Sequence, residues 1–177
     1  MAETMRKLRF FTIPQWEKEA NWLRRMHRQG WKLTGIFGPC VYKFERCTPE
    51  DVVYQLDFNP DGVEHKEEYV QMFHDCGWKY IQDMAGYSYF RKPVSEMNDA
   101  DETIFCDEDS RMDMMKRVWK GKVLPLLALF FCLLGTLVAQ RRHTAPFVML
   151  VILLAVYAVV LIQCGVAYWR MDQRRKK

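Results

Sequence analysis

Hydrophobic and polar residues follow two different periods in the first half of this chain and merge into long apolar runs in the second half. Some segments repeat apolar side chains every three or four positions, which predicts amphipathic helices, and others alternate strictly, which predicts strands with one buried face. A short strand around Leu8 to Phe11 comes first. The predicted elements that follow are helix 15–29, strands 31–37, 41–46 and 52–58, helix 63–76, and strands 78–83 and 86–91.

A short phrase ends both predicted helices. Gly-Trp-Lys occupies residues 30–32 and recurs at residues 77–79, 47 positions later. Glycine adopts positive φ readily, so it is suited to stop a helix. We expect the tryptophan to begin each following strand on the buried side and the lysine to point outward. At the same offset His27 aligns with His74, and Tyr42 aligns with Tyr89.

The repeated order strand, helix, strand, strand predicts the fold class. One such unit cannot cover its own apolar faces, so two units are expected to pack together. A strand-helix-strand step favours parallel pairing, whereas hairpins are antiparallel. Residues 1–92 are therefore predicted to form an α+β domain, in which two βαββ repeats share a mixed sheet with both helices on one face.

Charge is distributed unevenly along the chain. Residues 1–92 hold fourteen Lys/Arg and thirteen Asp/Glu, a balance typical of an ordinary soluble surface. Residues 93–110 hold seven acids and no Lys or Arg, which predicts an acidic linker. The net charge of +4 therefore does not indicate nucleic-acid binding, and no nucleic-acid partner is expected.

Two apolar runs predict membrane helices. Residues 123–140 and 144–169 contain no charged side chain and are long enough to span a bilayer, so we expect a two-helix transmembrane hairpin. Five Lys/Arg precede the first run, five follow the second and only two lie between them. The positive-inside rule then predicts a multi-pass protein of the plasma membrane with both termini in the cytoplasm. No signal peptide is expected at Met1 to Arg9, which contain no apolar core.

The basic flanks of these runs are predicted to contact anionic lipid headgroups. Residues 111–122 form either a helix on the bilayer surface, begun by Ser110 and Asp113, or the end of the first membrane helix; residues 170–177 form a basic cytosolic tail. Gln163 is a candidate for a hydrogen bond between copies of the chain. The predicted headgroup contacts are Arg111, Lys116, Arg117, Lys120, Lys122, Arg170, Arg174 and Arg175.

No catalytic, metal or cofactor site is predicted from motifs. The six cysteines form no C-x-x-C pair, and phosphate-binding loops, nucleophile elbows and zinc-protease motifs do not occur. Histidine at a helix C-terminus is explained by the helix dipole, although a deep polar pocket around His27 or His74 would favour an enzyme. Aromatic residues in a cleft between the repeats would suit a flat or cationic ligand. The candidate ligand contacts are Trp16, Trp22, Trp31, Trp78, Tyr87 and Tyr89.

A set of short strings occurs through the first half of the chain: Phe10-Phe11, Glu17-Lys18-Glu19, Trp22-Leu23, Met26, Gly30-Trp31-Lys32-Leu33, Tyr54-x-Leu56-Asp57-Phe58, Glu68-Tyr69, Gly77-Trp78 and Tyr89-Phe90-Arg91-Lys92. Together these strings resemble the bacterial family known as domain of unknown function 2812. The resemblance covers roughly residues 6–92 and implies no catalytic residue, because the family defines none. It does imply membrane helices after the domain and neighbouring genes for PadR-like regulators, and so a sensing or resistance circuit.

Two functions from different classes remain open on the sequence. The preferred hypothesis is a membrane-tethered, non-enzymatic regulatory or binding module, whose cytosolic domain senses a small molecule or docks a partner protein. The alternative is an accessory subunit of a transporter or of an envelope-stress or resistance complex. The expected partners are an anionic bilayer and either another protein or a second copy of the chain.

Overall fold

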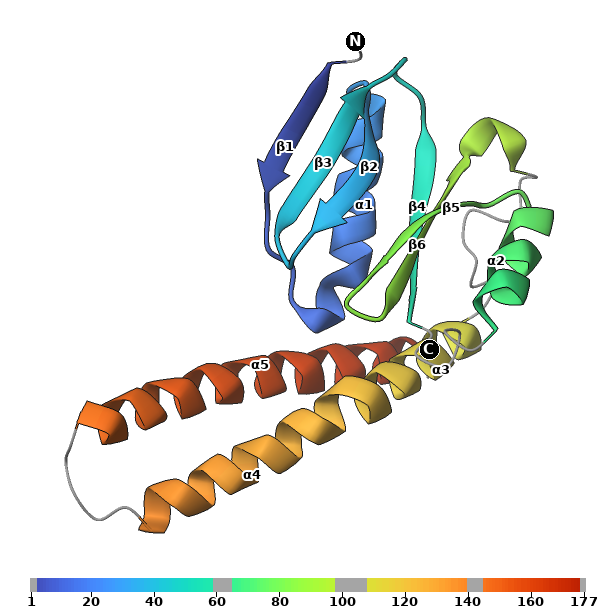
Figure 1. Ribbon diagram of the computed structural model, residues 1–177. Helices are drawn as coiled ribbons and strands as arrows, with labels where there is room; N and C mark the ends of the chain where they lie inside the picture. Colours follow the sequence, from blue (N-terminus) through green and yellow to red (C-terminus); the bar gives the residue numbers. More distant parts are fainter. Residues whose placement is uncertain (1–2, 59–64, 98–107, 140–144, 176–177) are drawn as a thin grey trace. The chain divides into compact units, whose positions relative to one another are not determined.

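The computed structural model describes residues 3–58, 65–97, 108–139 and 145–175, which fall into two compact units, Met1–Asp107 and Glu108–Lys177 (Figure 1). Each unit is described by itself. The first contains β1 (Thr4–Leu8), η1 (Ile13–Gln15), α1 (Trp16–Arg28), β2 (Trp31–Phe37), β3 (Val41–Arg46), β4 (Val52–Phe58), α2 (Lys66–Asp75), β5 (Lys79–Met84), β6 (Tyr87–Pro93) and η3 (Val94–Glu96). The second contains α3 (Glu108–Val118), η4 (Trp119–Val123), α4 (Leu124–Ala139) and α5 (Ala145–Arg175).

The first unit confirms the α+β class but not the predicted mixed sheet. Its strands form two three-stranded sheets, sheet A in the order β1-β3-β2 and sheet B in the order β4-β6-β5. Every strand pair among the described residues is antiparallel. The first and second strands of each repeat do run parallel to one another, as the strand-helix-strand rule requires. The third strand lies between them, however, so they never pair.

The two sheets approach each other along β2 and β5. The Gln82 side chain on β5 donates to the carbonyl oxygen of Ile36 and accepts from its N–H, both at 3.0 Å. The ladder within each sheet has an irregular register at the same place in both repeats, next to Leu33 and next to Tyr80. The Gln82 side chain thus provides hydrogen bonds between β5 and β2 of the kind that backbone groups provide within each sheet.

The two helices lie on opposite faces of sheet B, which corrects the prediction that both cover one face (Figure 1). Helix α1 packs between the sheets, whereas α2 covers the far face, where Phe73 joins Val53, Trp78 and Phe90 in a buried cluster. Strand β4 is consequently buried on both faces along its whole length. Its side chains do alternate between the two faces, but a helix covers each face, so the polar residues are buried as well as the apolar ones.

Glu19 connects the two repeats inside this arrangement. Its carboxylate lies on α1 and is buried, with only 7% of the residue surface exposed. It accepts one hydrogen bond from the Tyr42 hydroxyl of sheet A and one from the Tyr89 hydroxyl of sheet B, both at 2.7 Å. Burial, with the Glu19 charge, raises the pKa of both tyrosines, so both hydroxyls remain donors. A single carboxylate therefore joins sheet A, α1 and sheet B.

The internal repeat is confirmed, but its offset is not constant. Leu33 pairs with Phe44 in the first repeat, and Tyr80 pairs with Phe90 in the second, so the offset falls from 47 to 46 between the two strands of the hairpin. The cause is the turn: three residues separate β2 from β3, and two separate β5 from β6. Tyr89 therefore does not occupy the position equivalent to Tyr42.

The domain extends past its predicted end at residue 92. Pro93 closes β6, and η3 follows, with Val94 and Met97 packed against the cluster of Phe73 and Phe90. The predicted acidic linker 93–110 is thereby shortened, because α3 begins at Glu108 and not at Ser110. The predicted turn at residues 59–62 and the part of the linker at residues 98–107 lie outside the described residues.

The second unit supports one of the two interpretations of residues 111–122. Helices α3, η4 and α4 follow one another directly, and η4 is a π-helical turn. Met114, Met115 and Val118 are buried, and α3 packs against α5. The continuous helix favours the end of the first long helix over a separate surface helix, and the position of the segment at a bilayer stays a prediction.

Two helices are long and apolar enough to cross a membrane. The segments that satisfy this test are Asp113–Leu137 and Val148–Arg170. The Trp119 and Tyr168 rings lie 5.4 Å apart, so the start of one segment meets the end of the other, as in a hairpin. The Arg141–His143 turn lies outside the described residues. Length and composition are what support a membrane location here.

Candidate functional site

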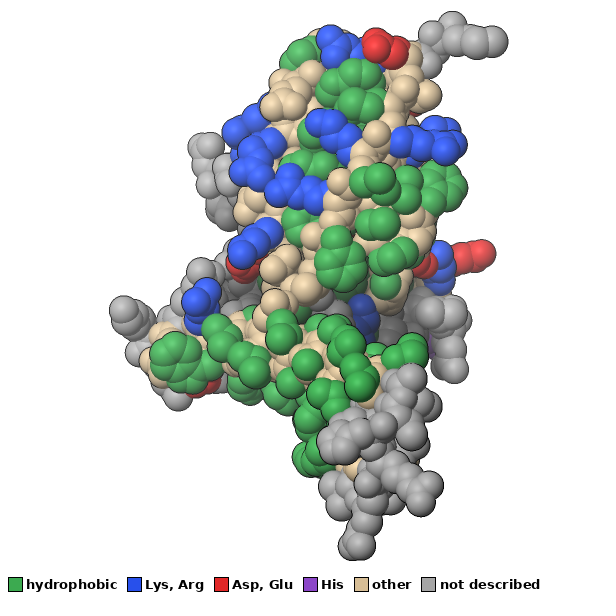
Figure 2. Space-filling model, turned by 90° about the vertical axis from the view of Figure 1, so that its left-hand side faces the viewer, with side chains coloured by type: hydrophobic (Ala, Val, Ile, Leu, Met, Phe, Trp, Pro, Cys, Tyr) green, Lys and Arg blue, Asp and Glu red, His purple; other side chains and the backbone are tan. Residues whose placement is uncertain are grey.

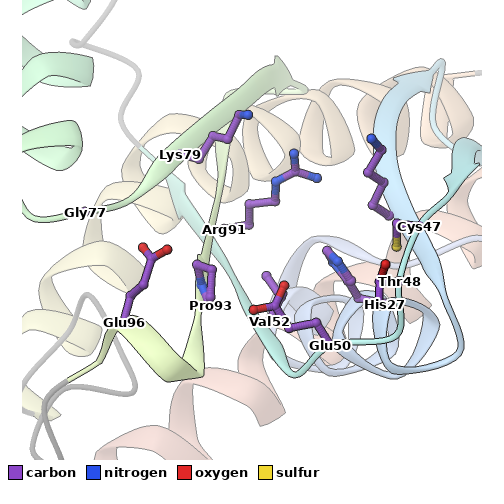
Figure 3. A pocket seen from close by; sticks show the side chains of 11 residues that line it. His27, Cys47, Thr48, Glu50, Val52, Gly77, Lys79, Arg91, Pro93 and Glu96 are labelled. Atoms are coloured by element: carbon purple, nitrogen blue, oxygen red, sulfur yellow. The ribbon is translucent and has the colours of Figure 1, made fainter.

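A cleft with a volume of about 360 Å³ opens between the two repeats of the first unit (Figure 3). This size is in the range of small-molecule sites. Its walls come from the C-terminal end of α1, the first residues of β2 and β5, the end of β6 and the segments that flank β4. The lining residues are His27, Lys32, Cys47, Thr48, Glu50, Val52, Gly77, Lys79, Arg91, Pro93 and Glu96.

The lysines of the two Gly-Trp-Lys phrases both line this cleft. Lys32 is the second residue of β2 and Lys79 is the first residue of β5, at equivalent positions of the two repeats. The glycines before them end their helices with φ of +82° at Gly30 and +80° at Gly77, which confirms their predicted role. The prediction that the lysines merely point outward is incomplete, because the repeat brings both ammonium groups to one cleft.

Arg91 adds a third cation from β6. Arg91 and Lys79 are paired across sheet B, which directs both side chains to the same face. In Figure 3 the Arg91 guanidinium extends from its strand into the space between Lys79 and His27. Its Nη1 donates to the Leu33 carbonyl oxygen at 3.3 Å, and this bond reaches from the second repeat to the first. Hydrogen bonding thus holds the guanidinium in the cleft.

His27 is the buried polar member of the lining. The Tyr54 hydroxyl oxygen accepts from the Leu33 N–H at 3.2 Å and lies 2.9 Å from His27 Nδ1. Burial raises the pKa of Tyr54, so the hydroxyl keeps its proton at neutral pH and forms a neutral hydrogen bond with Nδ1. Burial, followed by the charges of Arg91 and Lys32, lowers the pKa of His27 from 6.5 to about 4.

This depressed pKa predicts a pH-dependent stability. Between pH 6.5 and 4 the unfolded chain binds a proton at His27 that the folded chain does not, so stability is present above pH 6.5 and declines as the pH falls. We expect about 2 kcal/mol of unfolding free energy to be lost from pH 7 to pH 5. Urea unfolding of the full chain in detergent, followed by tryptophan fluorescence at both pH values, measures this loss.

Two variants make that measurement specific. His27→Gln should remove most of the difference in unfolding free energy between pH 7 and pH 5, even if it also changes the stability at both pH values. His74→Gln changes the exposed histidine at the equivalent position of the second repeat and should leave the difference intact. A difference that persists in His27→Gln would contradict the assignment.

The charges of the cleft favour an anion. Lys32, Lys79 and Arg91 bring three positive charges to the lining, against two carboxylates at Glu50 and Glu96; the Lys32 ammonium also lies 3.3 Å from the Glu45 carboxylate, which is not part of the lining. The His27 imidazole and the Thr48 hydroxyl add neutral polar groups. Guanidinium and ammonium groups together bind carboxylate and phosphate oxygens well. Among the residues that the structure describes, no three His, Cys, Asp or Glu side chains gather to hold a metal ion.

The six aromatic residues predicted as ligand contacts do not line this cleft. Trp16 is buried, Trp22 packs on Tyr42 and Phe44, and Trp78 belongs to the cluster under α2. The remaining three are Tyr87 against Phe58, Tyr89 bonded to Glu19, and half-buried Trp31 beneath the Arg46 guanidinium. These side chains pack against other residues of the domain instead of lining the cleft. The feature of the sequence that points to residues lining the cleft is the repeated Gly-Trp-Lys phrase, because both of its lysines lie there.

The predicted headgroup contacts all belong to the second unit. Lys116, Lys120 and Arg170 are exposed, and Lys116 pairs with Asp113 at 2.8 Å. Arg117 lies in the last turn of α3, and Lys122 lies within the π-helical turn η4. The side chains of Arg111, Arg174 and Arg175 lie outside the described part of the structure. Their contact with lipid stays a prediction.

Comparison with protein families supplies an assignment for the chain. The model of a family described as "Protein of unknown function (DUF2812)" matches residues 15–129. This chain is a DUF2812 protein. The DUF2812 match begins after β1 and continues through α3 into α4, so it reaches well beyond the range of 6–92 expected from the sequence. Comparisons of this DUF2812 chain with curated proteins and with solved structures find no match.

Proposed function

We propose that this DUF2812 protein is a membrane-tethered, non-enzymatic regulatory module whose cytosolic domain binds a small organic anion in the cleft between its repeats. The observation that carries the proposal is the convergence of Lys32, Lys79 and Arg91 on a cleft with a volume of about 360 Å³. Carboxylate or phosphate groups are the chemistry that such a set of donors recognises. A cationic ligand, one of the expectations from the sequence, would be repelled by these charges.

The placement of the cleft suits a regulatory role. Its lining comes from both repeats, and Arg91 of the second repeat bonds to Leu33 of the first. An anion held by Lys32 and Lys79 would add a further connection between the repeats. Binding would therefore stabilise one relative arrangement of the two sheets, which is how a ligand shifts a conformational equilibrium. In this proposal both chain termini lie in the cytoplasm and the two apolar helices span the membrane.

The geometry favours binding over catalysis. A histidine with a pKa of about 4 is a weak base at neutral pH, whereas efficient general bases have a pKa close to the working pH. Nδ1 of His27 is engaged by Tyr54, and the Asp57 carboxylate accepts a hydrogen bond from the Tyr69 hydroxyl on the far face of sheet B. The cleft therefore offers charge and donors more than an activated nucleophile.

Anion binding is tested with the full chain in detergent by isothermal titration calorimetry. The probes are citrate and inorganic phosphate, with ethidium as the cationic comparison. We expect the anions to bind and Arg91→Gln to weaken binding roughly 10- to 100-fold, because a hydrogen bond to a charged group contributes about 1.5–3 kcal/mol. Lys79→Gln should weaken it in the same direction.

Lys18→Gln serves as the matched control. Lys18 is an exposed cation on α1 that does not line the cleft, so its loss changes the net charge equally and should leave the affinity unchanged. Equal weakening by Lys18→Gln and Arg91→Gln would indicate a general charge effect and contradict the site. Binding of ethidium in preference to both anions would also contradict it.

A further inference from the structure

Among the described residues of the first unit, helix α1 packs on one face of sheet A, and no helix packs on the other face. Phe44 and Tyr42 on β3 point to α1, where they contact Trp22. The neighbouring strand follows the same alternation, since Met5 is paired with buried Phe44 and the Lys7 ammonium reaches the Met26 sulfur of α1. The side chains between these positions therefore point away from α1. We call this surface the outer face of sheet A.

Strand register arranges the outer face in rows. Leu8, Val41 and Phe37 are paired across the three strands and form an apolar row at one end of the sheet. Arg6 and Lys43 form the next row, which is cationic. The row beyond it contains Glu45 with Lys32, whose ammonium and carboxylate lie 3.3 Å apart. The order along the sheet is thus apolar, cationic and then mixed.

The apolar row is unusually open to solvent. Leu8 is 79% exposed, and Phe37 is 57% exposed. The Arg9 N–H donates to the Cys40 carbonyl oxygen, which continues the ladder by one step and gives Phe10, 67% exposed, the same outward direction as Leu8. Figure 2 shows this side of the domain, where many Lys/Arg and hydrophobic side chains share the surface with few acidic ones. Exposed apolar patches of this kind mark interaction sites.

The chain itself indicates what this face meets. Residues 98–107 separate the domain from α3, and ten residues can span no more than about 36 Å in any conformation. The chain that connects the domain to the helices able to cross a membrane is thus short. A bilayer held this close is present at high effective concentration. Its anionic headgroups complement Arg6 and Lys43, and its interface accepts exposed leucine and phenylalanine side chains.

We propose that the outer face of sheet A docks on the anionic surface of the membrane that anchors the chain. Leu8, Phe10 and Phe37 enter the interfacial region, and Arg6 and Lys43 contact the headgroups behind them. An acidic protein, or the acidic residues 98–107 of this chain, would satisfy the cations but would leave three aliphatic or aromatic side chains exposed. The five docking residues do not line the anion cleft, although Lys32 in the mixed row does. The docking proposal rests on the membrane anchor of the proposed function and not on anion binding.

Hydrogen exchange of the full chain in lipid nanodiscs tests this docking. One set of discs contains phosphatidylcholine alone, and the other contains 30% phosphatidylglycerol. We expect amide exchange in residues 4–10 and 37–43 to slow roughly tenfold in the anionic discs, and this protection to disappear in high salt, which screens surface charges. Exchange in α2, on the far side of sheet B, should be equal in the two sets.

Three variants complete the experiment. Arg6→Glu with Lys43→Glu should abolish the protection through charge reversal, and Phe37→Ser should reduce it without any change in charge. Lys18→Glu with Arg25→Glu makes the same change in charge at exposed positions of α1 and should preserve it. Equal exchange in both kinds of disc would overturn the proposal. Protection that appears only when cell extract is added would assign the face to an acidic protein and would overturn it as well.

Discussion

Replacement of Glu19 by alanine is expected to lower the unfolding free energy of the soluble domain by about 2–5 kcal/mol, because it leaves two buried tyrosine hydroxyls without an acceptor. The hydroxyls of Tyr42 and Tyr89 both reach this carboxylate at 2.7 Å, and each belongs to a different sheet. Urea unfolding of the full chain in detergent, followed by tryptophan fluorescence, measures the loss. Few single substitutions elsewhere in the domain should approach it.

The tyrosine variants separate hydrogen bonding from packing at this position. Tyr42→Phe and Tyr89→Phe each remove one donor and should cost about 1 kcal/mol. In the background of Glu19→Ala, the same changes should cost little, since the acceptor is already lost. Asn21→Ala, at an exposed position on the same helix, should change stability by less than about 0.5 kcal/mol. Additive losses in the double variants would show that Glu19 does not couple the two sheets.

The second large effect is expected at Gly30 and not at its equivalent Gly77. Both residues have φ near +80°, so alanine at either position carries backbone strain of about 1–2 kcal/mol. At Gly30 a Cβ atom would also lie 2.9 Å from the Cys47 carbonyl oxygen, which is backbone. At Gly77 the nearest atom is the Lys92 side chain, 3.2 Å away and able to move. We expect Gly30→Ala to cost about 3 kcal/mol or more and Gly77→Ala less than 2.

Gly38 isolates the strain component of this comparison. Its φ is +59°, and no atom lies within 4 Å of the position a Cβ would take, so Gly38→Ala reports the cost of the backbone conformation alone. The unfolding free energies of the three alanine variants, measured side by side, should rank Gly30 well above the other two. Similar losses at all three positions would contradict a steric contribution from Cys47. Valine at Gly30 or Gly77 should be worse than alanine, because β-branched side chains tolerate positive φ poorly.

Periodicity and turn residues predicted the elements of the domain, because both depend on local sequence. The alternation over residues 52–58 indicated β4, and the two glycines marked the ends of α1 and α2. Which face of β4 meets which helix was not predictable, since apolar side chains such as Val53 and Leu56 suit either neighbour. The change in the offset between the two repeats was not predictable either. A two-residue turn at Ala85 and Gly86 shifts all later positions by one, and only the strand register reveals it.

The candidate cleft was less predictable than the fold. Aromatic residues were the obvious candidates for a ligand site, yet in a domain of this size they are needed to fill the core, as Trp22 and Trp78 do. The lining instead consists of residues that are individually ordinary, such as Lys79 and Arg91. Their proximity depends on how β2 and β5 meet, through Gln82, and on the bond from Arg91 to Leu33. A single sequence contains no signal for that contact.

The position of α1 between the two sheets also determines how the domain can be divided. If the chain were cut after residue 50, the second repeat would lose the helix that covers Tyr54, Leu56 and Tyr89, all of which are buried in the intact domain. The first repeat would keep α1 but expose the side of it that meets β4. Although the two halves resemble each other in sequence, neither is an interchangeable building block. The shortest fragment that preserves the packing contains both repeats and ends after Met97, where η3 completes the second core.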